Sequence, residues 1–134
     1  TRNMTKYSHL FEPITIGSMT VKNRIFQSAV GTHLATENYE VTDRHLAYFE
    51  KRARGGVGLI TTECIVMQPD TRYTTFHGLG LFEDRMVDEL KKVTDLVHKY
   101  DTRIAARRRS PRLSTTTANS LWRLRPSNVG RLVR

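Results

Sequence analysis

Few side chains in this chain have the types and spacing that carry chemistry on their own. The single cysteine, Cys64, has no cationic neighbour in the sequence that would favour its reactive thiolate. His45, His77 and His98 lack the spacing of a metal site, and the pattern favours surface positions for them. Neither a nucleophilic triad nor a pair of catalytic carboxylates is discernible. The residue types alone therefore define no reaction and no metal site.

The glycine-rich stretch 55–58 resembles a phosphate-binding loop in composition but not in context. Such loops follow a strand and open a helix, whereas this one follows the basic, helix-like residues 51–54 and precedes an apolar run. Two glycines after a helical pattern are typical of a helix C-terminus, and the apolar run after them predicts a buried strand. We therefore interpret residues 51–64 as half of a βα repeat.

The segments before this stretch complete a strand–helix–strand unit. Residues 25–30 predict a strand, and Thr42 can cap a helix that has Asp43 in its first turn. The apolar side chains of that helix fall on one face at three- and four-residue steps: Leu46, Phe49 and Ala53. About 40 residues hold the whole pattern, which is the length of a βαβ unit in a parallel sheet.

The remaining segments extend this pattern in both directions. Residues 14–21 alternate around Gly17-Ser18, which predicts a two-residue hairpin that closes one end of a larger structure. A turn at residues 69–70 opens a loop of about fifteen residues, a length that often has a function. A second helix is expected from Asp84, and residues 102–106 begin a third strand.

The second predicted helix carries an apolar stripe and charged pairs. The stripe consists of Met86, Leu90, Val93, Val97 and Tyr100. Asp88–Lys92 and Asp95–Lys99 are spaced i,i+4 in the favourable order, and we expect them to form ion pairs.

The positive charge of the chain is concentrated in its last part. The net charge is +9, yet residues 107–134 hold eight arginines and no Asp, Glu or Lys. We expect that residues 107–109 cannot continue a buried strand, because their charges would have to leave water. We therefore predict three segments: a flexible N-terminus at 1–9, an α/β domain at 10–106 and an arginine-rich, disordered or out-of-frame tail at 107–134.

Composition sets the general class of the protein. We expect a soluble protein without a membrane partner, for three reasons. The apolar share is 38%, no run of about 20 apolar residues occurs, and an N-terminal apolar signal is lacking. One cysteine excludes an intrachain disulfide framework and suits a reducing compartment, so we expect a cytoplasmic location.

Three motifs in order resemble the N-terminal part of the Old Yellow Enzyme-like flavoproteins, and most closely the FMN-dependent NADH:flavin oxidoreductases and 2,4-dienoyl-CoA reductases. They are LFEPITIGSMTVKNRI with the strand IFQSAV, then VTDRHLAYFEKRARGGVGLITTE, then GLGLFEDRMVDELKKVTDLVHKYDTRIA. The resemblance covers residues 10–106. It implies the N-terminal portion of a TIM (β/α)8 barrel, with a hairpin, about three strands and two helices. Barrels of this family hold FMN at the C-terminal ends of their strands.

The resemblance also implies an activity and its partners. Members of the family transfer a hydride from NADH or NADPH through the flavin to a small-molecule acceptor, an activated alkene or enone-like compound. By position, the residues expected to bind the flavin are Ser28, Ala29, Val30, Gly31, Thr32 and Cys64. His33 matches a position that faces the substrate side of the flavin.

The resemblance stops at Ala106. In the family, the third strand continues there with a glutamine that binds the flavin, and later strands carry the phosphate and substrate sites. A shift of reading frame or a truncation there would account for this break and for the charge break together. We therefore expect this chain alone to be inactive, and a non-catalytic fragment is the first alternative function. The second is a non-specific nucleic-acid binder through the arginine-rich tail, without a specific nucleic-acid target.

Overall fold

The computed structural model of the chain describes residues 6–67 and 77–109. Its elements are α1 (Ser8–Phe11), β1 (Ile14–Ile16), β2 (Met19–Val21), β3 (Phe26–Gln27), α2 (Asp43–Arg54), β4 (Leu59–Val66), α3 (Arg85–His98) and β5 (Arg103–Arg109). The predicted turn at residues 69–70, most of the loop after it and residues 110–134 lie outside the described part. In residues 6–67 and 77–109, no helix is long and apolar enough to cross a membrane.

The N-terminal segment holds one helix that the sequence did not predict and one hairpin that it did. The short helix α1 begins at Ser8, inside the stretch 1–9 that we expected to be flexible. β1 and β2 pair antiparallel, with Ile16 opposite Met19. Gly17 has φ of +61°, and the residue after it has no positive φ, which is the pattern of a type II′ turn. The hairpin prediction is confirmed.

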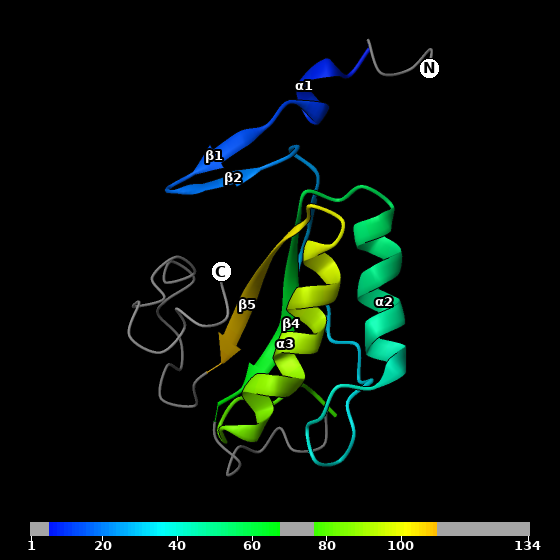
Figure 1. The fold of residues 1–134 in the computed structure, drawn as a ribbon, viewed down its shortest axis with the longest axis vertical. Helices are drawn as coiled ribbons and strands as arrows, with labels where there is room; N and C mark the ends of the chain where they lie inside the picture. Colours follow the sequence, from blue (N-terminus) through cyan, green and yellow to red (C-terminus); the bar gives the residue numbers. More distant parts are fainter. Residues whose placement is uncertain (1–5, 68–76, 110–134) are drawn as a thin grey trace.

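The hairpin lies at the end of the molecule where the parallel strands begin (Figure 1). Arg103, the first residue of β5, donates a hydrogen bond from Nε to the Thr20 carbonyl at 3.0 Å. Asn23, just after the hairpin, donates from its side-chain amide to the Gly56 carbonyl at 2.7 Å. These contacts place the hairpin across the N-terminal ends of β4 and β5, the closing position that the sequence predicted.

The three parallel strands β3, β4 and β5 form one sheet in that order. Phe26 of β3 pairs with Leu59 of β4, and Leu59 pairs in turn with Arg103 of β5. The helices α2 and α3 connect successive strands and pack beside each other (Figure 1). One core cluster joins side chains from both helices and from β4: Phe49, Ala53, Ile60, Val93 and Val97. The predicted βαβ arrangement is confirmed, as are the second helix and the third strand that complete βαβαβ.

The two helices begin and end close to where the sequence predicts. The Thr42 side chain accepts a hydrogen bond from the His45 backbone N–H and caps α2. The chain leaves α2 through Gly55 and then Gly56, where φ is +96°. In α3 the predicted stripe is buried: Met86, Leu90, Val93 and Val97, with Tyr100 partly buried beyond the helix end.

The ion pairs of α3 differ from the predicted ones. Lys92 pairs with Glu89 instead of Asp88, and Asp95 pairs with Lys91 at 2.7 Å instead of Lys99. Side chains three and four residues apart in either direction are neighbours on a helix, so each charge has more than one partner within reach. Spacing alone therefore did not determine the pairs.

β5 extends past residue 106, the last residue of the predicted strand, although Arg107 and Arg108 are not buried in it. β5 runs through Arg109, and Arg107 and Arg108 pair with residues of β4. In the described part of the chain β5 is an edge strand, and the side chains of Arg107 and Arg108 are exposed. Their charges therefore remain in water, and the desolvation cost that the prediction assumed does not arise.

Candidate functional site

The residues predicted to bind a flavin lie at the C-terminal ends of neighbouring strands. Residues 28–32 follow β3 directly, and Cys64 lies near the end of β4, which pairs with β3. Ser28, Val30 and Gly31 are exposed, and Val30 is 50% exposed despite its apolar side chain. The structure thus brings the two predicted groups of residues to the same edge of the sheet.

His33 lies beside this strip. Its backbone has φ of +54°, a conformation that non-glycine residues adopt rarely. A Cβ added to Gly31 would lie 3.7 Å from the His33 Nε2 atom, so the imidazole lies next to the exposed backbone at Gly31. The predicted substrate-side residue therefore adjoins the predicted flavin-side residues.

A β-bulge in β4 determines which residues face this edge of the sheet and which face the helices. Thr61 pairs with Ala105 and Cys64 with Arg107, so β4 has one residue more than β5 between these pairs. Ile60 and Ile65 consequently both pack against the helices, although they are five residues apart. By alternation, Glu63 shares the face of Ile65, and Cys64 faces the opposite way.

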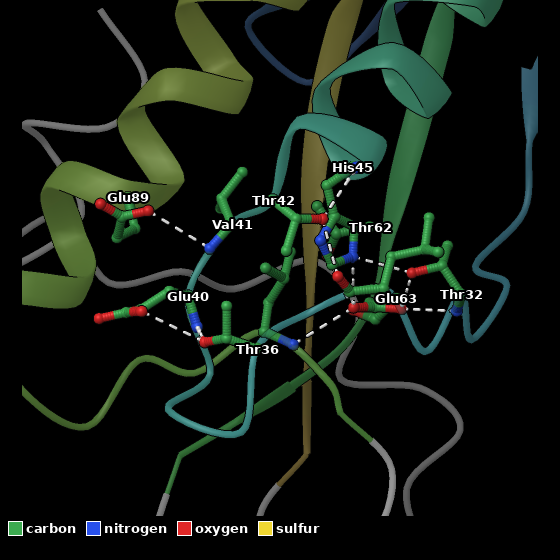
Figure 2. Close-up of polar contacts among 11 residues, drawn as sticks. Thr32, Thr36, Glu40, Val41, Thr42, His45, Thr62, Glu63 and Glu89 are labelled. Atoms are coloured by element: carbon green, nitrogen blue, oxygen red, sulfur yellow. Dashed lines mark hydrogen bonds and ion pairs between the residues drawn. The ribbon is translucent and has the colours of Figure 1, made fainter.

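The bulge places the Glu63 carboxylate inside the protein, at the centre of a buried polar cluster (Figure 2). Oε2 accepts hydrogen bonds from the Thr32 backbone N–H at 2.6 Å and from the Thr32 hydroxyl at 2.7 Å. Oε1 accepts from the Leu79 backbone N–H at 3.2 Å and lies 3.2 Å from His45 Nε2. Glu63 is only 3% exposed, so almost all of its hydrogen bonding comes from these groups.

His45 is the second buried member of this cluster, and the prediction of a surface position for it is wrong. Its side chain is fully buried and stacks on Phe49, one turn further along α2. His45 Nε2 lies 2.8 Å from the Thr32 hydroxyl oxygen. Because that hydroxyl donates to Glu63, it accepts from His45, which places a proton on Nε2. His45 Nδ1 is buried without a partner among the described residues.

The hydrogen bonds to Glu63 determine its ionisation. Burial by itself would raise the pKa of the Glu63 carboxyl. The hydrogen bonds from His45 and Thr32 outweigh burial and hold the pKa of Glu63 below its ordinary value of 4.5. The carboxylate is therefore charged at neutral pH, which suits an environment that consists of hydrogen-bond donors.

Sequence reasoning missed both Glu63 and His45 as members of a site. A signal was present for Glu63, because it is the one acidic residue in the otherwise uncharged strand sequence LITTECIV. His45 shares a helix face with Phe49 and Ala53 through its i,i+4 spacing, and this also indicated burial. In residues 6–67 and 77–109, this cluster included, no group of three or more His, Cys, Asp or Glu side chains could hold a metal ion.

Comparison with known proteins identifies first the fold of this chain and then its family. The solved structure of Old Yellow Enzyme from a Pichia species matches 75% of this chain, with a TM-score of 0.68 and 31% identity. Old Yellow Enzymes are TIM barrels, so the described elements are the N-terminal portion of a TIM (β/α)8 barrel, as the sequence predicted. The family model of the NADH:flavin oxidoreductase / NADH oxidase family matches residues 9–107. The chain belongs to this family of oxidoreductases.

Two curated relatives agree with this assignment. The chain is 33% identical over 101 residues to an NADH oxidase of Thermoanaerobacter brockii, and 30% identical over 99 residues to an N,N-dimethylglycine/sarcosine dehydrogenase of Chromohalobacter salexigens. These matches cover 75% and 73% of this chain, but only 16% and 14% of the two relatives. The match to the Pichia enzyme covers 26% of that protein. The chain thus spans about a quarter or less of these relatives.

Proposed function

We propose that this chain supplies part of the flavin site of an FMN-dependent oxidoreductase that takes its hydride from NADH or NADPH. The observation that carries the proposal is the strip at residues 28–32, in which Ser28, Val30 and Gly31 are exposed, and which lies beside Cys64 at the C-terminal edge of the sheet. Membership of the NADH:flavin oxidoreductase family supports the choice of cofactor. TIM barrels place their sites at this edge.

The backbone at Gly31 fits the close approach of a flat ring. Its φ is not positive, and a Cβ there would make only an ordinary contact with the His33 side chain. Neither the conformation nor the packing of the described residues therefore requires glycine at this position. A ligand that lies against the backbone would explain it, because any side chain would then occupy the space of the ring.

The proposed roles of the residues follow from their places. Residues 28–31 present backbone and small side chains to the isoalloxazine, with Thr32 at one end of the strip and Cys64 on the next strand. His33 lies on the substrate side, where an activated alkene or enone-like acceptor would bind. The chemistry that FMN supplies when bound is acceptance of a hydride and its delivery to that acceptor.

Binding of FMN to the purified chain tests the proposal, measured by quenching of flavin fluorescence and by co-elution on gel filtration. We expect saturable quenching that Gly31→Val weakens about tenfold or more, which corresponds to ~1.4 kcal/mol, because the new side chain overlaps the flavin. Thr15→Val serves as the control, since Thr15 is exposed in β1, at the opposite end of the strands from residues 28–32. We expect this control to bind FMN as the unsubstituted chain does.

The opposite result would support the second candidate function, a non-catalytic fragment. A chain that unfolds cooperatively yet leaves flavin fluorescence unchanged would show that residues 28–32 and 64 do not hold FMN by themselves. We expect no turnover of NADH by the chain in either case, because the described residues provide only three parallel strands of an eight-stranded site.

A further inference from the structure

We propose that Glu63 is a positioning residue, whose carboxylate fixes the loop after β3 in the geometry that receives the flavin. The proposal rests on the proposed function and deepens it. Glu63 points toward the helices, whereas its neighbour Cys64 faces the opposite side of the sheet, so the carboxylate acts through other residues.

The carboxylate joins three segments that are separate in the sequence. Thr32 belongs to the loop after β3, His45 to α2, and Leu79 to the segment before α3. Thr32 contributes both its backbone N–H and its hydroxyl, so four donors surround two oxygen atoms, and the single His45 Nε2 proton is shared between Glu63 and the Thr32 hydroxyl oxygen (Figure 2). A carboxylate is acceptor-only and can satisfy all four donors, which no neutral side chain of similar size can do.

The bond to the Thr32 backbone N–H carries the effect to the flavin side. That N–H belongs to the peptide bond between Gly31 and Thr32, which is planar. At an N···O distance of 2.6 Å, the Glu63 carboxylate sets the orientation of this peptide plane. The plane includes the Gly31 carbonyl, and Gly31 is the residue at which we propose that the ring approaches the backbone.

An apolar residue would suit the packing at position 63 better than a charged one. Ile60 and Ile65 on the same face are apolar and buried against the helices. Replacing a buried charge by a well-packed apolar side chain is often neutral or stabilising. A buried, fully bonded glutamate at this place is therefore better explained by the geometry that it imposes on Thr32 and Leu79 than by stability.

The test compares the whole chain with its Glu63→Gln variant and uses Glu89→Gln as a matched control. The Glu89 carboxylate also accepts from a backbone N–H of this loop, that of Val41 at 3.3 Å, but Val41 lies next to α2, nine residues after Thr32. The first readout needs no flavin: amide NMR spectra and hydrogen exchange of Thr32 and Leu79. The second readout is the affinity for FMN.

We expect Glu63→Gln to shift the Thr32 amide proton upfield and to speed its exchange about tenfold or more. The reason is that Gln replaces one acceptor oxygen by an NH2 group, which cannot accept a hydrogen bond from the donors around it. Exchange at the core residues Ile60 and Val93 should speed up only as far as the loss of global stability requires, so the Thr32 chemical shift reports the local change. FMN affinity should fall about tenfold. Glu89→Gln should leave the Thr32 amide and FMN binding unchanged. A second pair of variants tests the cluster if Glu63→Gln fails to fold. Thr32→Ser keeps the hydroxyl and should retain the cluster, whereas Thr32→Val removes it and should loosen the cluster.

The possible outcomes separate the two proposals. An unchanged Thr32 amide in Glu63→Gln would overturn the positioning role, whether or not FMN binds. A loosened loop with unchanged FMN affinity would overturn it as well. Failure of the unmodified chain to bind FMN would refute the proposed function for this chain, while the NMR arm would still report whether Glu63 holds the loop.

Discussion

At the scale of single residues, the most consequential feature is a charged group in the core. Glu63 is buried between the sheet and α2, and it is stabilised as a carboxylate by His45 and Thr32. Unpaired buried charges are strongly unfavourable, so the Glu63 carboxylate stays charged only while its donors are in place. The donors in turn need the carboxylate as their acceptor. The cluster therefore links the ionisation of one side chain to the order of the loop after β3.

This linkage predicts a pH dependence of stability. The pKa of Glu63 in the folded chain is below 4.5, its ordinary value, so the unfolded chain binds the proton more tightly. The stability that the carboxylate contributes is fully present well above pH 4.5 and is lost as pH falls through the pKa of the folded state. His45 is the titratable side chain in contact with it. We expect the difference in free energy of unfolding between the chain and Glu63→Gln, about 1–3 kcal/mol at neutral pH, to shrink in acid.

Urea denaturation from neutral pH down to about pH 3 measures this difference, and Glu89→Gln shows the effect of removing a less buried carboxylate. A difference between the chain and Glu63→Gln that grows toward acid pH would contradict the assignment of Glu63 as the stabilising charged group.

At the scale of elements, close contacts at the two ends of the strands position the site. The C-terminal ends carry the polar cluster. The N-terminal ends lie at the side of the molecule where the hairpin is (Figure 1), and Arg103 binds the hairpin there. Gly58, just before β4, is part of the second set: a Cβ there would lie 2.4 Å from Asn23 Oδ1 and 2.7 Å from the Asn23 carbonyl. The backbone segments are thus in direct contact, which only glycine permits.

Gly58→Ala should therefore destabilise the fold by about 1–3 kcal/mol, because the added methyl group forces the hairpin away from β4. Thermal unfolding followed by circular dichroism measures the loss. Gly31→Ala is the matched control, since a Cβ at Gly31 meets only ordinary van der Waals contact. Equal melting temperatures for Gly58→Ala and the unsubstituted chain would show that the segments do not depend on this contact.

At the scale of the whole molecule, the described elements are a parallel sheet with its helices packed together, and β5 lies at its edge. Exposed strand edges can pair with strands of other molecules, and charged side chains on an edge strand oppose this. The exposed Arg107 and Arg108 place such charges on β5. We propose that residues 110–134 add charge to the chain and nothing to its core. The proposed boundary lies after Arg109, three residues later than the sequence predicted, because β5 continues to that residue.

A chain that ends after Arg109 tests this proposal. We expect its melting temperature to match that of the full chain, while non-specific binding to DNA weakens because five arginines are absent. The dependence of log affinity on log salt should become shallower as fewer phosphates are neutralised. Thermal unfolding and DNA titrations at two salt concentrations provide the two measurements. A large fall in melting temperature would place part of the fold in residues 110–134.

The sequence by itself determined the elements and their family. Apolar periodicity, the Thr42 cap and the glycines at 17, 55 and 56 are local signals. They predicted the hairpin, both long helices and the alternation of helices with parallel strands. The motifs then identified the barrel family. These properties depend on residues close together in the chain, which is why they can be read from it.

Only the tertiary structure decided how the site is held. One extra residue in β4 reverses the alternation of its side chains, and this turns Glu63 toward His45 and Thr32. No local pattern specifies a bulge, because it depends on the register between two strands that are distant in the sequence. The extent of β5 was also misjudged, because the exposure of its arginines depends on which parts of the fold cover the two faces of the strand.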